Sequence, residues 1–466
     1  MLRDVLDRFR LGMILLACLL TISASVSLAG QDDPTWQAHV DPSGQIFPSM
    51  VLGMATATAI QGRDEPLDVP ETAEAQAIAD AVAAQTLGDP RGWIYVTLRA
   101  PKDRTQIRVT ISCDEIMEPS TYRGVLEKAG AFYGIAPRIR WKYQTLAAIR
   151  QPSPVNVVFQ VAIDGSEVDE QVQVATLHTI NDCPILHVEE DADTGLATIR
   201  DLSPMFAAYV NEDHPWVDAL LSEAIGTHLV DQFTGYQLGN ADEVFKQVYA
   251  VWNVLQQRGL TYSDISRTSS REGTVPSQHV RLLDESIAMK QANCVDGSVL
   301  LASILRKIGI DVFLMSTPTH CYIGFFTDAG RATMAGLETT MLGQARKDEF
   351  ERTKTLRSLL NDDRTFSQAS FDSFNAALAV GTKNLEADVV KIQAGEFQYI
   401  QVLINEAREQ GIRAIPYVAP PAVTIPGRPA APDAQQQLRD ELESLRIPEP
   451  SKDPGAETPA DDEPKR

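Results

Sequence analysis

A cysteine and a histidine, two residue types that act together in nucleophilic catalysis, lie near each other in the middle of the chain. Cys294 begins an apolar segment with helical periodicity that ends at Lys307 and is followed by Gly309. A thiol at a helix N-terminus lies at the positive end of the helix dipole, which favours the reactive thiolate. Asp296 suits the same dipole, and we interpret it as an acid that stabilises the helix start.

A histidine and an acid follow on two segments that have the pattern of strands. Residues 320–326 alternate, so His320 opens a strand and its side chain points away from that of Cys321. His320 is thereby placed to pair with the Cys294 thiol as a base. Glu338, on the next predicted strand, is the candidate that orients the imidazole and stabilises its charged form. The sequence predicts a catalytic triad of Cys294, His320 and Glu338.

This pattern resembles the transglutaminase-like superfamily of papain-fold cysteine enzymes, and more narrowly a bacterial exported branch of it. The resemblance covers about residues 205–345, and more loosely 91–412, and it rests on Ser277 to Leu282, Asn293 to Asp296, the helix through Gly309, His320, and Glu338 to Thr340. It implies a nucleophile at Cys294, a base at His320 and an orienting acid at Glu338. The implied chemistry passes through a thioester at an amide, either as hydrolysis or as acyl transfer to an amine.

The chain departs from this family pattern at two positions. The branch commonly has Gly-His-Ala at the histidine, where this chain has Thr319, His320 and Cys321, and its acid is Glu338 where Asp is commoner. Neither departure removes a catalytic atom, because Cys321 points away from His320 and the longer Glu still reaches the imidazole. The substrate that this resemblance implies is a protein or a peptide.

Other residues are candidates for supporting roles. The side-chain amide of Gln278 is an oxyanion-hole candidate, as a glutamine is in papain-like sites, and the backbone N–H of Cys294 is the other donor. A structural hydrogen bond is the alternative role for Gln278. Tyr322 and Trp252 are aromatic candidates for lining a cleft, but we expect both to pack in the core.

Two alternatives to catalysis remain open in the sequence. In the first, the fold is kept, the triad is silent, and the protein is an envelope protein that binds a protein partner. In the second, Cys294 is a small buried apolar residue and His320 is an ordinary strand residue. A disulfide between Cys294 and Cys321 would silence the thiol, but their opposed side-chain directions argue against it. We expect no metal and no cofactor, since no set of residues has the spacing of zinc or calcium ligands, and we interpret His178 and His187 as strand residues.

The rest of the chain predicts an α+β fold. Period-two alternation predicts a β-sandwich-like module over 91–200, with a hairpin at Asp164-Gly165, preceded by a weakly patterned extension over 30–90. Helical periodicity predicts a transglutaminase-like core with flanking helices over 204–345. A further helical region is expected over 346–415.

Composition points to an exported protein. Residues 1–29 have three arginines, an apolar run and a small-x-small motif, as a cleaved signal peptide does; an uncleaved membrane tether over 11–29, or a lipid on Cys18, are the alternatives. The site would then be periplasmic or secreted, where Cys113 and Cys183 are either a disulfide or two free thiols. Residues 416–466 hold 11 of the 27 prolines and predict a disordered acidic tail. The net charge of -22 disfavours nucleic acid as a partner.

Overall fold

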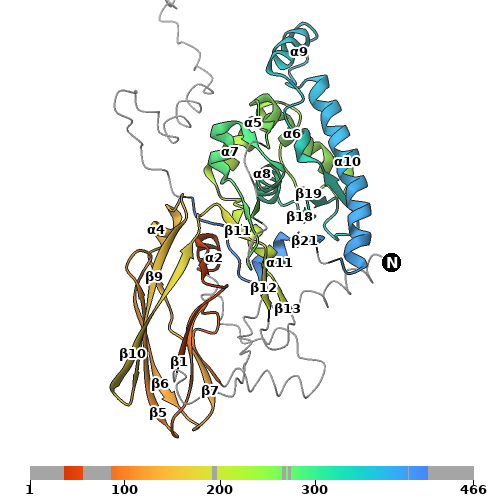
Figure 1. Cartoon of the computed structure of the whole chain (residues 1–466). Helices are drawn as coiled ribbons and strands as arrows, with labels where there is room; N and C mark the ends of the chain where they lie inside the picture. The colour runs from red at the N-terminus through yellow and green to blue at the C-terminus, as the bar shows by residue number, and fades with distance from the viewer. Residues whose placement is uncertain are drawn as a thin grey trace, which may run out of the picture. The chain divides into compact units, whose positions relative to one another are not determined.

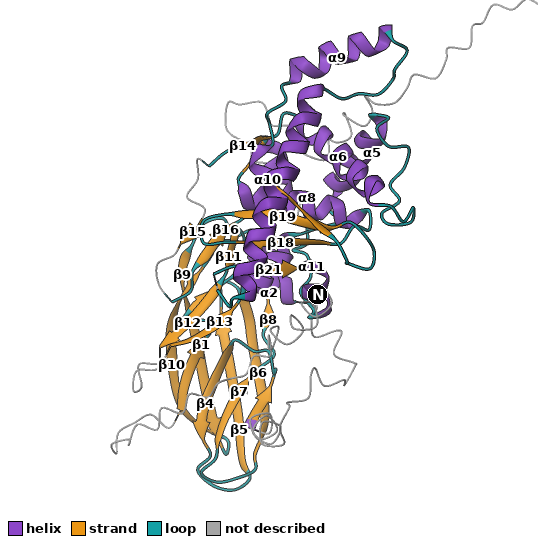
Figure 2. Cartoon of the chain, turned by 90° about the vertical axis from the view of Figure 1, so that its right-hand side faces the viewer, coloured by secondary structure: helices purple, strands orange, loops and turns teal. Residues whose placement is uncertain are grey.

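The computed structural model of the chain describes residues 36–55, 85–190, 197–264, 269–270, 274–396 and 398–417. These residues form a mixed α+β protein, which confirms the predicted fold class (Figure 1). Strands dominate the N-terminal part, and helices surround a smaller sheet in the C-terminal part (Figure 2). The described residues up to Pro416 belong to one compact unit.

The N-terminal part contains two sheets whose inner faces supply buried apolar residues to a shared core. The larger sheet has the order β2-β10-β9-β5-β6-β8 and the smaller one the order β1-β4-β7-β3. The strands of the larger sheet are β2 (Gln45–Ile46), β5 (Thr105–Cys113), β6 (Met117–Leu126), β8 (Arg140–Trp141), β9 (Ser153–Ile163) and β10 (Ser166–Leu177). Those of the smaller sheet are β1 (Trp36–Val40), β3 (Thr86–Gly88), β4 (Ile94–Arg99) and β7 (Phe132–Ala136).

The hairpin between β9 and β10 lies where the sequence predicts it. Asp164 and Gly165 both have positive φ values, 50° and 85°, which a two-residue turn with the twist of a hairpin requires. The two strands pair antiparallel, with Val172 opposite Val158. Buried residues alternate with exposed ones along β9, so this strand has one face in the core.

The strand-rich part begins earlier than the sequence predicts. Residues 30–90 were expected to be an extension, yet β1 pairs antiparallel with β4 and β2 pairs with the end of β10. The short helix α2 (Pro48–Met54) follows β2 and is buried. The partner strands of β1 and β2 lie about 60 and 130 residues further along the chain, so local periodicity could not reveal this pairing.

Between β8 and β9 lies the short helix α4 (Tyr143–Ala147). Short elements then connect the strand-rich part to the helices: β11 (Asp182–Pro184), β12 (Leu186–Glu190), β13 (Ala197–Asp201) and the 3-10 helix η2 (Ser203–Tyr209). β11 pairs with β16 (Ser277–His279), which in turn pairs with β15 (Ser269–Ser270). Cys183 lies opposite Gln278 in this ladder.

The helical part is built around α8 (Cys294–Lys307), whose middle is fully buried. The helices α5 (Pro215–Gly226) and α6 (Ala241–Gln257) lie in the region where helical periodicity predicts helices; Pro215 is the first helical residue of α5, and Asn240 caps α6. Two short parallel strands, β14 (Thr261–Tyr262) and β17 (Gln291–Ala292), lie before α8, and α7 (Leu283–Met289) precedes β17. α8 packs against both α5 and β19.

An antiparallel sheet with the order β20-β19-β18-β21 backs α8. It consists of β18 (Val312–Ser316), β19 (Cys321–Phe326), β20 (Met334–Leu337) and β21 (Ile400–Leu403). β20 leads into the 3-10 turn η3 (Thr339–Met341). The helices α9 (Lys347–Leu359), α10 (Gln368–Gln393) and α11 (Ile404–Glu409) complete the chain, and α10 lies against β20.

The predicted helical region over 346–415 needs one correction. Residues 400–403 are not helical but form β21, which pairs antiparallel with β18 and so extends the core sheet. This strand has only four residues and lies between two helices, and its partner strand lies about 90 residues earlier. Four residues are too few for a periodic pattern to distinguish β21 from the helical residues on either side.

The described cysteines, Cys113, Cys183, Cys294 and Cys321, are all free thiols. Cys113 and Cys183 are buried and are not joined to each other. The predicted signal peptide and the predicted tail from residue 418 onward lie outside the described residues. Among the helices that the structure describes, none combines the length and the apolar character that a membrane crossing needs.

Candidate active site

The first turn of α8 presents Cys294. Asn293 caps the helix, and its side-chain oxygen accepts hydrogen bonds from the N–H groups of Val295 and Asp296, both at 2.9 Å. The Asp296 carboxylate reaches back to the Asn293 N–H at 3.1 Å, which completes a capping box. Cys294 is therefore the first helical residue, and it is only partly buried. The predicted helix start and the predicted role of Asp296 are confirmed.

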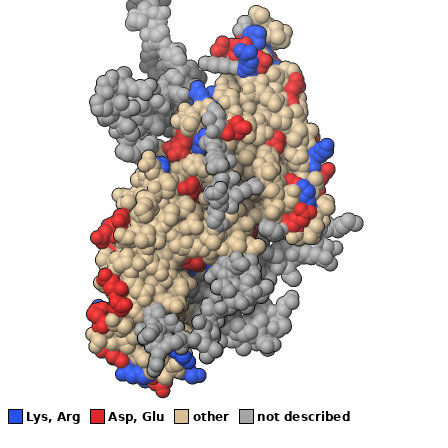
Figure 3. Space-filling view, viewed as in Figure 1, with Lys and Arg blue, Asp and Glu red and all other residues tan. Residues whose placement is uncertain are grey.

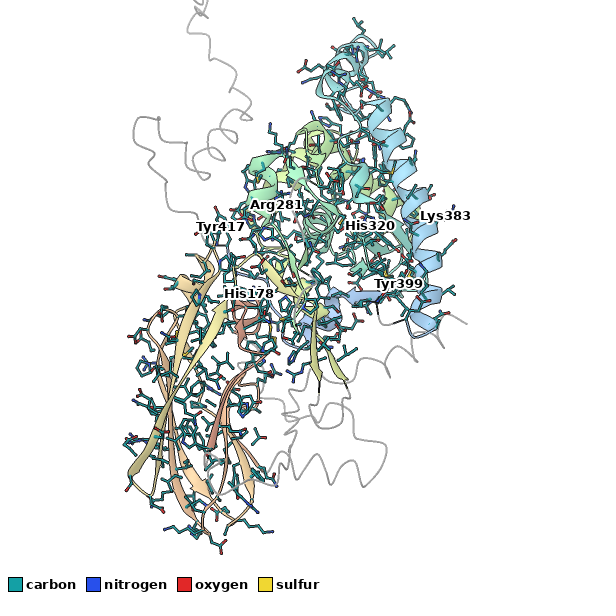
Figure 4. All side chains as sticks on the ribbon, viewed as in Figure 1. His178, Arg281, His320, Lys383, Tyr399 and Tyr417 are labelled. Carbon is teal, nitrogen blue, oxygen red and sulfur yellow. The ribbon has the colours of Figure 1, made fainter. Side chains whose placement is uncertain are left out.

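His320 lies just before β19, in the helical part of the chain (Figure 4). It interacts with both other members of the predicted triad. Its Nε2 is 2.7 Å from Oε2 of Glu338, and its ring lies close enough to the Cys294 side chain for the two groups to interact. Because Nε2 faces the carboxylate, Nδ1 is the ring nitrogen that remains for the thiol. The interaction with the Cys294 side chain, followed by the hydrogen bond with Glu338, raises the pKa of His320 to about 10, against the effect of burial. The imidazole is thus held in its charged form at neutral pH.

Glu338 is buried, with a residue exposure of 5%. Burial acts to raise the pKa of Glu338, but the hydrogen bonds from His320 and Thr340 outweigh it and lower that pKa below its usual value. Its second oxygen, Oε1, accepts hydrogen bonds from the backbone N–H of Thr340 at 3.1 Å and from the Thr340 hydroxyl at 2.7 Å. Both carboxylate oxygens are therefore occupied, which fixes the carboxylate in one orientation.

The turn after Glu338 also contacts the helix of the nucleophile. The Thr339 hydroxyl is 3.2 Å from the carbonyl oxygen of Cys294, which accepts a second hydrogen bond from the Ser298 hydroxyl at 2.7 Å. Gly297 permits this approach, because a Cβ atom there would lie 3.2 Å from Cβ of Thr339. Glu338 and Cys294 are thus held by contacts between adjacent backbone segments as well as through His320.

A buried ion pair stabilises the same end of α8. Arg281 donates from its backbone N–H to Oδ1 of Asp296 at 2.8 Å and from its guanidinium to Oδ2 at 3.0 Å. The Asp296 side chain is fully buried. Burial raises the pKa of Asp296 even though these hydrogen bonds and the Arg281 charge act in the opposite direction. A buried carboxylate held in this way fixes the segment before α8 to the turn that carries Cys294.

Neighbouring aromatic and thiol groups lie where the sequence predicts them. Tyr322 and Trp252 are fully buried, so both pack in the core and neither lines an open cleft. Cys321 is buried in the core cluster shared with α8, whereas Tyr322 belongs to the cluster on the α10 side. Burial raises the pKa of Cys321 well above its usual value, so this residue stays a neutral thiol beside the site.

Gln278 lies on β16, and its side-chain amide donates to the backbone carbonyl of His279 at 3.1 Å. This hydrogen bond matches the structural role that the sequence left as the alternative. Its neighbour His279 acts electrostatically on Asp296, so β16 passes near the N-terminus of α8. The oxyanion role of Gln278 stays a prediction.

Sequence reasoning missed three residues of the site. Thr339 binds the carbonyl of Cys294, Thr340 binds the carboxylate of Glu338, and Tyr262 lies beside the strand that leads into Cys294. After burial, the charges of Cys294, Asp264 and Glu338 raise the pKa of Tyr262, which places its phenol within electrostatic reach of the site. In the sequence, two threonines directly follow the candidate acid Glu338, and this was the signal from which Thr339 and Thr340 could have been found.

The histidines of the strand-rich part lie in hydrogen-bonded settings. His178 follows β10, stacks on Phe47 at 4.1 Å and contacts Gln45, while His187 lies on β12 and contacts the Ser43 hydroxyl. Among the residues that the structure describes, no group of three or more His, Cys, Asp or Glu side chains is arranged to hold a metal ion.

No known family model matches the chain, and no curated protein matches it in sequence. The site must therefore be interpreted from its own geometry.

Proposed function

We propose that this protein is a transglutaminase-like cysteine enzyme that acts on amide bonds of a protein or peptide through a thioester. The observation that supports this best is the position of His320 between Cys294 and Glu338, with Nε2 at 2.7 Å from the carboxylate and the ring within interaction range of the Cys294 side chain. A nucleophile, a base and a residue that orients the base are the parts that covalent acyl transfer needs.

The chemistry follows from the protonation states. The Cys294 thiolate attacks the carbonyl carbon of the amide, and the C–O π electrons move to oxygen to give a tetrahedral oxyanion. The N–H of Cys294, at the start of α8, is the candidate backbone donor to that oxyanion. Protonated His320 then gives its proton to the leaving amine as the C–N bond breaks, which leaves a thioester on Cys294.

The second half of the reaction uses the same groups. Neutral His320 takes a proton from water or from a second amine as that nucleophile attacks the thioester. The sulfur leaves as a thiolate, and His320 is again the charged partner of Cys294. Water as the nucleophile gives hydrolysis, and an amine gives acyl transfer. Glu338 keeps its charge throughout and orients the imidazole, because its other oxygen is already bound by Thr340.

The family proposal agrees with the arrangement of the elements that carry the triad. The nucleophile begins a buried helix, and the histidine and the acid lie at the ends of adjacent strands of the sheet that packs on this helix. The papain-like order of nucleophile, histidine and acid along the chain is kept. We further propose that the protein is exported, which mass measurement of the mature N-terminus tests directly.

The test compares wild type with Cys294→Ala, since this variant keeps the fold but removes the sulfur. Proteins of the producing cell's envelope are incubated with each, and new N-termini and incorporation of a fluorescent primary amine are measured by mass spectrometry. The proposal predicts products that require Cys294. If the folded variant gives the same products as wild type, or neither gives any, the proposal is wrong, and the alternative of a silent protein that binds a partner takes its place.

A further inference from the structure

We infer that Tyr262 and Asp264 form a cation-selecting rim beside Cys294, so that the enzyme takes amides flanked by a Lys or Arg side chain. This inference rests on the proposed function and names the substrate class for that site. It concerns the strand β14 and the residues directly after it, none of which belongs to the proposed triad.

Backbone contacts fix Tyr262 between the two elements that carry the nucleophile and the acid. Tyr262 pairs in parallel register with Ala292, two residues before Cys294, and the N–H of Ser263 donates to the Ala292 carbonyl at 3.0 Å. On its other side, the Tyr262 N–H donates to the carbonyl of Leu342 at 3.3 Å, at the end of the turn that follows Glu338. A ligand at Cys294 is therefore close to this strand.

Two side chains of this segment are open to solvent beside the site. Tyr262 is 39% exposed, and Asp264, which follows the buried Ser263, is exposed and close enough to the phenol to raise its pKa. The phenol is one of few large aromatic side chains exposed in the described part of the chain, and the others that are exposed to this degree, Phe132, Tyr143 and Phe371, lie on other elements. An exposed aromatic ring with a carboxylate two residues away is the pairing that binds ammonium and guanidinium groups.

Acidic groups outnumber basic ones around the Tyr262 phenol. After burial, Cys294, Asp264 and Glu338 raise its pKa, and the charged His320 between Cys294 and Glu338 offsets only one of these three charges. On the face drawn in Figure 3, groups of acidic side chains and groups of basic side chains both occur. A positively charged group beside the scissile amide would therefore be stabilised at this rim, and a negatively charged one would be repelled.

Charged thiol reagents test this without knowledge of the substrate. The full chain is treated with methanethiosulfonates that carry an ammonium or a sulfonate group, and with the neutral methyl reagent. Each forms a mixed disulfide on Cys294 and releases methanesulfinate, and peptide mapping reports Cys294 alone. We expect the ratio of ammonium to sulfonate rate constants to be at least about threefold lower in Asp264→Asn than in wild type.

Matched variants separate the possible outcomes. Asp169→Asn, an exposed aspartate on β10, should leave the ratio unchanged. Tyr262→Phe should keep the preference for the ammonium reagent, and Tyr262→Ala should weaken it, because the ring face binds the cation. Equal rates for the two charged reagents in wild type, or a ratio that Asp264→Asn does not lower, would overturn this inference while leaving the triad intact. A Cys294 that reacts with none of the three reagents would overturn the proposed function itself.

Discussion

The Thr339 hydroxyl lies 3.2 Å from the carbonyl oxygen of Cys294, so the residue after the acid binds the backbone of the nucleophile. The next residue, Thr340, binds the acid through both its N–H and its hydroxyl. Two consecutive threonines thus hold the two ends of the triad. A Glu side chain has one more rotatable bond than Asp, and the Thr340 contacts limit the freedom that this bond adds.

Loss of the acid should weaken the charged form of His320. In Glu338→Gln the imidazole loses its carboxylate partner, and we expect the His320 pKa to drop by about one pH unit or more, with slower alkylation of Cys294 at neutral pH. NMR titration of the imidazole checks this. Glu386→Gln, which removes an exposed carboxylate from α10, is the control and should change neither quantity. An unchanged His320 titration in Glu338→Gln would show that the carboxylate does not support the charge.

The pair of His320 and Glu338 also predicts how the free energy of unfolding depends on pH. The folded-state pKa of His320 is raised from 6.5 to about 10, so its contribution to the free energy of unfolding is complete below about pH 6.5 and is lost as the pH rises toward 10. The lowered pKa of Glu338 gives a contribution that is present above its usual value and is lost in acid. Urea unfolding at pH 6 and pH 10 should show a larger loss of stability in wild type than in His320→Gln. Equal losses would contradict the assignment.

A close crossing of α10 and β20 should be sensitive to added bulk. A Cβ atom on Gly381 would lie 2.5 Å from the carbonyl carbon of Gly336, and neither backbone can move freely. Gly381→Ala should therefore lower the free energy of unfolding by about 1–3 kcal/mol. The Glu338 N–H donates to the carbonyl of Ala377 on the same helix, so a displacement of α10 would also displace Glu338. We therefore expect Gly381→Ala to slow the alkylation of Cys294. In Gly226→Ala the new Cβ meets nothing within 4 Å, so this control should be neutral or stabilising.

The buried ion pair before α8 should dominate the stability of this region. Asp296→Ala removes the capping box and the fully buried partner of Arg281, and we expect a loss of at least about 3 kcal/mol in the free energy of unfolding. Urea denaturation measures this. Asp242→Ala, at the exposed first turn of α6, is the matched control, with an expected loss below about 1 kcal/mol. Similar losses in the two variants would mean that the ion pair contributes little.

The sequence predicts those elements whose pattern is local. The strands β4, β5, β9 and β10 alternate clearly, and the Asp164-Gly165 turn fixes one hairpin. The strand β6 is not evident from the sequence. Its buried face holds few apolar residues, and most of its other residues are polar or charged. β1, β2 and β21 are short, and their partners lie far along the chain, so tertiary pairing decides their structure.

The three residues of the proposed triad could be located in the sequence for a related reason. Cys294 is marked by a helix start, His320 by the start of an alternating strand, and Glu338 by its place after the next strand. Thr339 and Tyr262 could not be predicted, because their roles depend on how a turn and a strand pack against α8. Gln278 shows the reverse: its residue type suggested an oxyanion donor, whereas its amide binds the His279 carbonyl.

The pH dependence of Cys294 alkylation by iodoacetamide is the most direct test of the proposed ion pair. Cys321 is first mutated, and wild type is compared with His320→Ala. An ordinary thiol titrates near pH 8.5 and is only about 3% thiolate at pH 7, so we expect the His320→Ala rate at pH 7 to fall by up to about 30-fold. Wild type should instead react at a nearly constant rate across neutral pH. Identical pH profiles in the two proteins, or no reaction in either, would contradict an activated Cys294.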